Sequence, residues 1–136
     1  MSPHQAPSYD EIDAFDLPDW LGETEATWSA ELGLGTGHRV PGRLTAEAHD
    51  PVACDLLAVD DAYPEPVVVD AVRVQAHRHW RHGQVLLLAD GDRVVLAVPG
   101  IRLDPERVLE AIGRLARAVG APEGTYAVRL RVDRRP

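Results

Sequence analysis

The fold is decided by the stretch Gln84-Val85-Leu86-Leu87-Leu88-Ala89-Asp90-Gly91-Asp92-Arg93-Val94-Val95-Leu96-Ala97-Val98. Two apolar runs are joined here through Asp90-Gly91, a dipeptide that tolerates the positive φ angles of a tight primed turn. Apolar runs of this length, bounded by turn residues, are typical of strands. The stretch therefore predicts a β-hairpin.

Two helices are predicted, one on each side of the hairpin in the chain. Asp104-Pro105-Glu106 supplies an N-cap, a proline at the first helical position and an acid in the first turn, and Gly120 ends the helix. Its buried stripe consists of Val108, Ile112, Leu115 and Val119. Residues 67–82 also follow a helical period, although the valines at 67–69 favour a strand.

The first half of the chain predicts three strands. Residues 25–32 alternate between apolar and polar side chains, and residues 39–47 do so again after the glycine-rich segment 33–37. Residues 52–59 are almost wholly apolar, which is typical of a strand at the centre of a sheet. A last strand, with one basic face, is expected to begin at Tyr126.

The resulting expectation is an α+β fold with a mainly antiparallel sheet, in the order α-βββ-α-ββ-α-β, and with the helices packed on one face. With 136 residues the chain fits one domain, which we place at residues 22–133. Residues 1–21 form an acidic N-terminal arm that is partly disordered, with room for a short helix over residues 9–16 that Ser8 and Glu11 would cap.

Composition limits the classes of function. The formal net charge is −8, which argues against nucleic acid, because phosphate binding depends on neutralising cations. No apolar run is long enough to span a membrane, and the first residues lack the order of a secretory signal. The single Cys54 fits a reducing compartment. We therefore expect a soluble, cytoplasmic protein, and the absence of lysine among its basic residues is typical of bacterial proteins from GC-rich genomes.

The charge is unevenly distributed along the chain. Residues 1–65 carry a formal charge of −12 and residues 66–136 carry +4, which together give the total of −8. The two halves are therefore electrostatically complementary. They either fold against each other or pair between two subunits.

No motif predicts a cofactor, a metal or a catalytic group. Of the histidines at 77, 79 and 82, only His79 and His82 share a helix face, and the arginines among them would repel a cation. Residues 33–37 resemble a phosphate-binding loop only faintly, because a strand follows them and no P-loop lysine is present. Cys54 lies in an apolar run, where a thiol is most often buried and unreactive.

The arm and the arginines remain as candidate binding surfaces. Acidic and large apolar side chains alternate around Phe15 and Trp20, a pattern that suits either docking on another protein or packing on this protein's own sheet. Arginines on the second helix and the last strand suit carboxylates, which the chain itself supplies in quantity. The candidate partner-binding residues are Phe15, Trp20, Arg73, Arg81, Arg129 and Arg131.

In its expected element order, the chain resembles the small α+β domain of bacterial type III secretion chaperones and their non-secretory relatives. The resemblance covers about residues 8–120, leaves the strand at Tyr126 as an extra element, and transfers no site residue. It implies a homodimer that binds extended segments of a partner protein and has no catalytic centre.

The leading hypothesis is thus a non-enzymatic protein-binding or adaptor domain, chaperone-like and dimeric, whose partner is another protein or a second copy of the chain. The alternative is a small-molecule-binding protein or enzyme with a pocket between sheet and helices. Cys54, His79 and Trp80 are then the candidate residues for the lining of that pocket.

Overall fold

The computed structural model describes residues 9–34, 37–61, 64–122 and 124–130. These residues form an eight-stranded sheet with two α-helices and two short 3-10 helices. In chain order the elements are β1 (Asp10–Glu11), η1 (Ala14–Asp16), η2 (Asp19–Gly22), β2 (Ala26–Ala30), β3 (Arg39–Val40), β4 (Gly42–Thr45), β5 (Val52–Ala58), α1 (Asp70–Arg81), β6 (Leu86–Asp90), β7 (Arg93–Val98), α2 (Pro105–Ala118) and β8 (Tyr126–Arg129).

The sheet is mixed, so the expectation of a mainly antiparallel sheet and the expected element order are wrong. The strand order is β1-β6-β7-β5-β4-β2-β8, with β3 paired to β5. β5 and β7 run parallel, as do β2 and β8. Because the β6–β7 hairpin folds back with β7 against β5, α1 and β6 together serve as the crossover that a parallel pair needs. The α+β class itself agrees with the structure.

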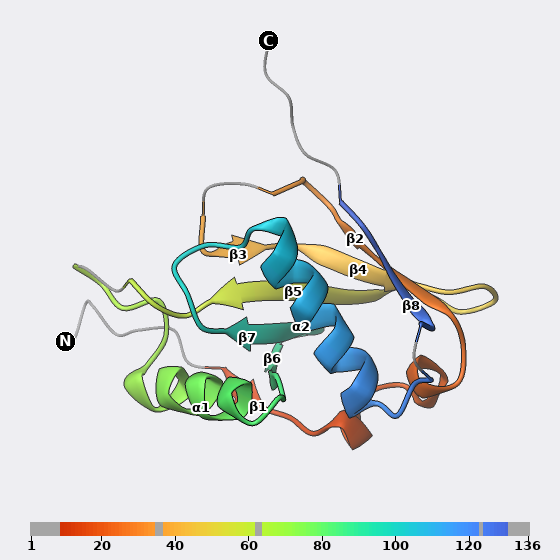
Figure 1. Cartoon of the computed structure of the whole chain (residues 1–136), viewed down its shortest axis with the longest axis horizontal. Coiled ribbons are helices and arrows are strands. Elements are labelled where there is room, and N and C mark those ends of the chain that lie inside the picture. Colours follow the sequence, from red (N-terminus) through yellow and green to blue (C-terminus); the bar gives the residue numbers. More distant parts are fainter. Residues whose placement is uncertain (1–8, 35–36, 62–63, 123, 131–136) are drawn as a thin grey trace, which may run out of the picture.

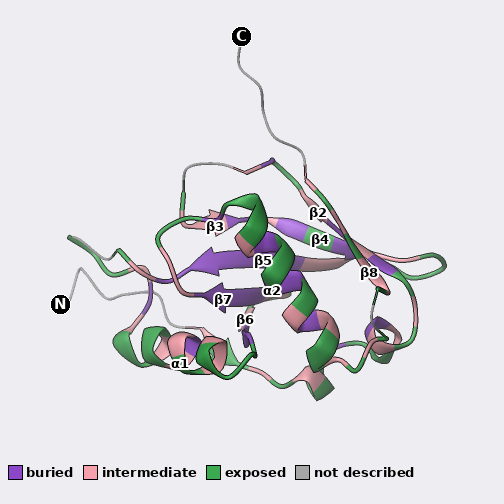
Figure 2. Ribbon diagram, in the orientation of Figure 1, coloured by how far each residue is buried: buried purple, intermediate pink, exposed green. Residues whose placement is uncertain are grey.

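The two helices cover opposite faces of the sheet, which corrects the expectation that both pack on one face. Val108, Ile112 and Leu115 of α2 pack in one cluster with Leu56 and Leu96. Leu57, Val95 and Ala97, which are next to these two leucines in the strands, belong to a second cluster together with Ala76 of α1. Since successive side chains of a strand point to opposite faces, the two clusters lie on the two sides of the sheet. In Figure 1, α2 crosses in front of the central strands and α1 lies beside β1, and Figure 2 shows β5 and β7 as the most continuously buried strands.

The segment before β2 is built differently from the expected helix over residues 9–16. Residues Asp10–Glu11 pair with β6, and the chain then forms η1 and η2; Ser8, the expected cap, lies outside the described residues. Leu17 and Leu21 are buried in the α2-side cluster. The Tyr126 hydroxyl donates a hydrogen bond to the Leu21 carbonyl over 2.6 Å. These contacts attach the segment to the core, whereas Phe15 is 96% exposed.

The local predictions for the hairpin and for α2 are confirmed. β6 and β7 pair antiparallel from Leu86↔Ala97 to Asp90↔Arg93, and Gly91 adopts a φ of 59° in the turn. Asp104 caps α2 by accepting a hydrogen bond from the Arg107 N–H over 2.8 Å. In the described part of the chain, no helix has both the length and the apolar character needed to cross a membrane.

Candidate functional site

A cleft opens at the outer edge of β6, where β1 ends. It has a volume of about 410 Å³ and is bounded by three parts of the chain. Residues 11–14 form one wall, the end of α1 with Gly83 and Gln84 forms the second, and Arg114, Arg117 and Ala118 of α2 form the third. The floor consists of Val85 and of Leu86 and Leu87, the first two residues of β6.

The floor of this cleft carries free main-chain groups. The Ile12 N–H donates to the Leu87 carbonyl over 3.0 Å, after which the chain turns away into η1. Main-chain groups alternate between the two sides of a strand, so Val85 directs its N–H and C=O to the same edge as Leu87. No described residue supplies a hydrogen-bond partner to either main-chain group of Val85. The residue is only 4% exposed, which makes these unpaired groups unusual.

Arg114 fixes the shape of the cleft by joining α2 to the end of α1. Its Nη1 donates to the carbonyls of Trp80 and Gln84 over 2.6 and 3.0 Å, and its Nη2 bonds Glu110. The guanidinium carbon lies 3.5 Å from the centroid of the Trp80 ring, a close cation–π contact. These bonds therefore link α2 to the end of α1 across the wall of the cleft.

The other polar side chains of the cleft leave one cation free. The His79 ring is oriented by a hydrogen bond of 2.9 Å from its Nδ1 to the Gln75 carbonyl. Arg117 is exposed and forms no ion pair with any described residue. Glu11 and Asp13 stand on the opposite wall. The cleft therefore offers a main-chain donor and acceptor between a basic side and an acidic side.

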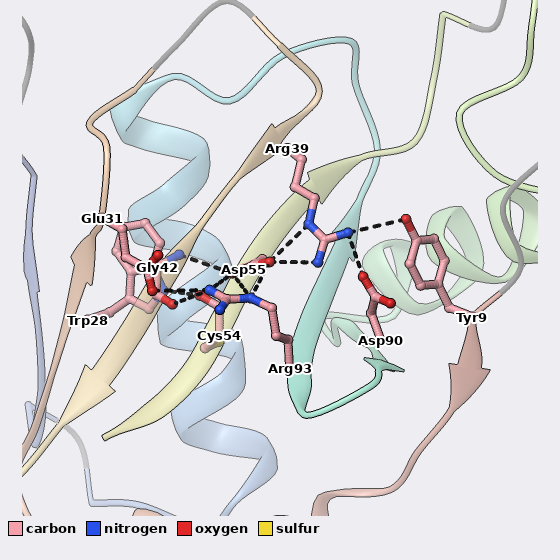
Figure 3. Close-up of polar contacts among 9 residues, drawn as sticks. All are labelled: Tyr9, Trp28, Glu31, Arg39, Gly42, Cys54, Asp55, Asp90 and Arg93. Atoms are coloured by element: carbon pink, nitrogen blue, oxygen red, sulfur yellow. Dashed lines mark hydrogen bonds and ion pairs between the residues drawn. The ribbon is translucent and has the colours of Figure 1, made fainter. Parts of the chain in front are cut away.

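A second polar cluster surrounds Asp55, the buried charged residue of the core, which is 1% exposed. Figure 3 shows Arg39 and Arg93 reaching its carboxylate from two sides. Arg39 donates from Nε and Nη2 over 2.9 and 2.7 Å, and Arg93 donates from Nε and Nη2 at 2.7 to 3.1 Å. The Gly42 N–H adds a bond of 3.1 Å. Five N–H groups from three strands thus converge on one carboxylate.

The electrostatics of this cluster fit a structural role. Burial raises the pKa of Asp55, but the hydrogen bonds from Arg93, Arg39 and the Gly42 N–H outweigh it and hold that pKa below its ordinary value. Arg93 also reaches Glu31 at 3.1 Å, and Arg39 reaches Asp90 at 2.8 Å. All of these partners are already engaged, so the cluster ties strands together and leaves little capacity for a ligand.

Cys54, considered above as a lining residue, is confirmed as a buried thiol. Burial, followed by the nearby charge of Asp55, raises the pKa of this thiol. The Trp28 indole N–H donates to the Cys54 carbonyl over 2.8 Å, and Trp28 itself is fully buried. A protonated, enclosed thiol is a poor nucleophile. Cys54 therefore contributes packing to the core.

The two candidate partner-binding residues of the arm, Phe15 and Trp20, have different surroundings. Phe15 projects from η1 beside a hollow of about 300 Å³ that Leu17, Gly22 and Val119 help to line. Trp20 is half-buried and stacks on His49, with ring centroids 4.6 Å apart. Neither side chain reaches the β6 cleft.

The candidate partner-binding arginines are dispersed over the molecule. Arg73 and Arg81 lie together on α1, where Arg73 forms an ion pair with Asp70. Arg129 lies on β8, at the far edge of the sheet from β1, and Arg131 is outside the described residues. The structure thus brings the α1 arginines together around one hollow, whose lining includes neither Phe15 nor Trp20 nor Arg129.

The histidines are also engaged separately. His77 contacts Asp60 and His79 contacts a carbonyl, and no group of three possible metal ligands occurs among the described residues.

Sequence reasoning missed both Asp55 and the β6 edge. Asp55 had a signal, because a lone acid inside the apolar run 52–59 must find cationic partners if the strand is buried. The edge had none, because it depends on where β1 separates from β6. Comparison of the chain with protein-family models, with curated proteins and with solved structures finds no match.

Proposed function

We propose that this protein is a non-enzymatic protein-binding domain that takes up an extended segment of a partner as an added strand along β6. The observation that supports this function is that no described residue pairs with the N–H or the C=O of Val85 at the floor of the cleft. An extended peptide satisfies such groups with its own main chain, while side pockets select its side chains. Proteins normally protect the free edge of a sheet from pairing with another chain. At Val85, no described residue pairs with the edge next to β6, and this edge lies inside a cleft.

The charges of the cleft suggest the chemistry of the segment. Arg117, which forms no ion pair with any described residue, stands on the α2 wall with the guanidinium of Arg114, and His79 lies at the end of α1. A segment with an acidic side chain or a terminal carboxylate near the Gln84 end would pair with Arg117. Glu11 and Asp13 would repel a second acid at the Leu87 end. The ion pairs between the segment and the cleft should then weaken as the salt concentration rises. The main-chain hydrogen bonds instead require the segment to be extended along β6.

A second copy of the chain is the further partner that we propose, in line with the dimer expected from the sequence. Phe15 is 96% exposed on a turn held by the Asp16-to-Asp13 and Leu17-to-Ala14 main-chain hydrogen bonds. A large apolar side chain presented to solvent from a hydrogen-bonded turn beside a hollow is available to an apolar partner. Light scattering of the wild type and Phe15→Ser would detect the dimer. The cytoplasmic location inferred from Cys54 belongs to the same proposal.

The strand-addition mode is tested by replacing Val85 with proline. Proline lacks the N–H but is tolerated at an edge where that N–H is unpaired. Val85→Pro should therefore fold and lose affinity for peptides that were selected on the wild type from a displayed random library. Val85→Thr, which has nearly the same shape and keeps the N–H, is the matched control. If Val85→Pro binds the selected peptides as well as Val85→Thr does, the main chain of β6 is not the binding element.

A further inference from the structure

A second hollow lies at the carboxyl ends of the parallel strands β5 and β7. Asp60 follows β5 and Gly100 follows β7, and the two residues are joined by the Asp60 N–H to Gly100 C=O bond of 2.8 Å. The carboxyl ends of parallel strands are where open sheets with helices on both faces most often bind ligands. α1, which connects this end of β5 to the β6–β7 hairpin, lies along the opening.

An acid and a histidine are fixed at this place. The His77 Nε2 lies 2.9 Å from both carboxylate oxygens of Asp60. The Gly100 N–H donates to the Asp60 Oδ2 over 2.8 Å. Asp60 is therefore occupied by neighbours from α1 and from the segment after β7. The imidazole is held in one orientation at the edge of the hollow.

Three arginines of α1 complete the lining. Arg73, His77 and Arg81 recur every four residues, which places them along one face of the helix, and Arg78 stands beside them. The hollow that they surround has a volume of about 380 Å³. Arg73 has an ion pair with Asp70, whereas Arg78 and Arg81 form none with any described residue. In a chain of net charge −8, the lining of this hollow carries three guanidinium groups against one carboxylate.

We infer that this hollow binds the phosphate group of a small phosphate monoester. The guanidinium groups of Arg78 and Arg81, which form no ion pair with any described residue, together carry a charge of +2, and this matches the charge of about −2 on a monoester at neutral pH. A single carboxylate would neutralise only half of it. The guanidinium groups also present paired N–H donors that fit phosphate oxygens. This site is separate from the β6 cleft and does not depend on the function proposed for that cleft.

The site is tested by NMR titration of the full chain with inorganic phosphate and with glycerol phosphate, at an ionic strength held constant with chloride. Shifts are expected at the Gly100 amide, at the His77 ring and along α1. Arg78→Gln and Arg81→Gln should each weaken binding about tenfold or more, because each removes a charge-assisted hydrogen bond. Arg43→Gln, an exposed arginine on β4, should bind as the wild type does.

Several results would overturn the inference. The first is that phosphate causes no chemical shift changes beyond those caused by chloride at the same ionic strength. The second is that the shift changes occur at exposed arginines over the whole surface. Another is unchanged affinity in both α1 variants. If a phosphoserine peptide binds about tenfold more tightly than glycerol phosphate, the ligand is not a small molecule. Val85→Pro should still bind phosphate, so a failure of the peptide site leaves this test unaffected.

Discussion

Replacing Asp55 with asparagine tests how the sheet is held together. The carboxylate accepts from five N–H groups of Arg39, Arg93 and Gly42. Removing one partner of a buried ion pair costs about 3 to 5 kcal/mol. The lower end applies here, because the two arginine side chains are 29% and 33% exposed and can regain water. Asparagine also keeps one oxygen for the Gly42 N–H. We therefore expect a loss of about 3 kcal/mol in the free energy of unfolding.

This loss of free energy corresponds to a decrease in the melting temperature. The entropy of unfolding is about 2.1 cal/mol/K per residue, or roughly 0.29 kcal/mol/K for 136 residues. The expected decrease is thus about 10 °C by calorimetry or circular dichroism. Asp90→Asn is the matched control, since it makes the same chemical change at a carboxylate that is 45% exposed and whose one ion pair among the described residues is with Arg39. Its effect should stay below about 1 kcal/mol, or about 3 °C.

The pH dependence gives a second readout of the same carboxylate. The pKa of Asp55 is lowered in the folded protein, so its contribution is fully present above the unfolded value of about 3.9. It is lost as the pH falls from there through the folded value. The difference between wild type and Asp55→Asn should therefore shrink in acid. An Asp55→Asn variant as stable as Asp90→Asn, or a difference that persists unchanged in acid, would refute the assigned role of this cluster.

Three further predictions concern packing. Gly42→Ala should destabilise the fold by about 1 to 3 kcal/mol in urea denaturation, because the added Cβ would lie 2.4 Å from the Trp28 ring. Gly113→Ala in α2 should instead stabilise the fold by about 0.5 to 1 kcal/mol in the same assay, because its Cβ meets nothing within 4 Å. Deleting residues 1–21 should lower the melting temperature sharply or cause precipitation. It removes Leu17 and Leu21, two buried leucines that contribute about 1.5 to 3 kcal/mol each. Phe15→Ser, the control, should melt as the wild type does. Cys54 should react with a thiol reagent only after denaturant is added, and rapid labelling of the native protein would contradict its burial.

The elements that the sequence predicted correctly are those specified by short-range signals. The hairpin turn at Asp90-Gly91 and the cap at Asp104 need only a few neighbouring residues to form, and both occur where the pattern placed them. The pairing of β7 with β5, and of β8 with β2, joins segments far apart in the chain, and no local pattern encodes it. The sheet was therefore mistaken for a mainly antiparallel one.

One long-range feature was nevertheless available in the sequence. The run 52–59 is apolar at almost every position, and a strand that is apolar on both faces needs cover on both faces. That requirement favours helices on two sides, as the structure has them. The same run contains Asp55, whose need for cationic partners pointed to arginines across the sheet. The open edge at Val85 could not be foreseen, because it arises from the point at which residues 12–14 leave β6.

Amide hydrogen exchange at Val85, followed by NMR, tests the central claim most directly. In the free protein the Val85 N–H should exchange fast, while the N–H groups of Leu86 and Leu88, which face β7, exchange slowly. A bound peptide that adds as a strand should slow the exchange at Val85 and leave its neighbours unchanged. A Val85 N–H that is already as slow as Leu86 in the free protein, or one that stays fast with peptide bound, would contradict the proposal.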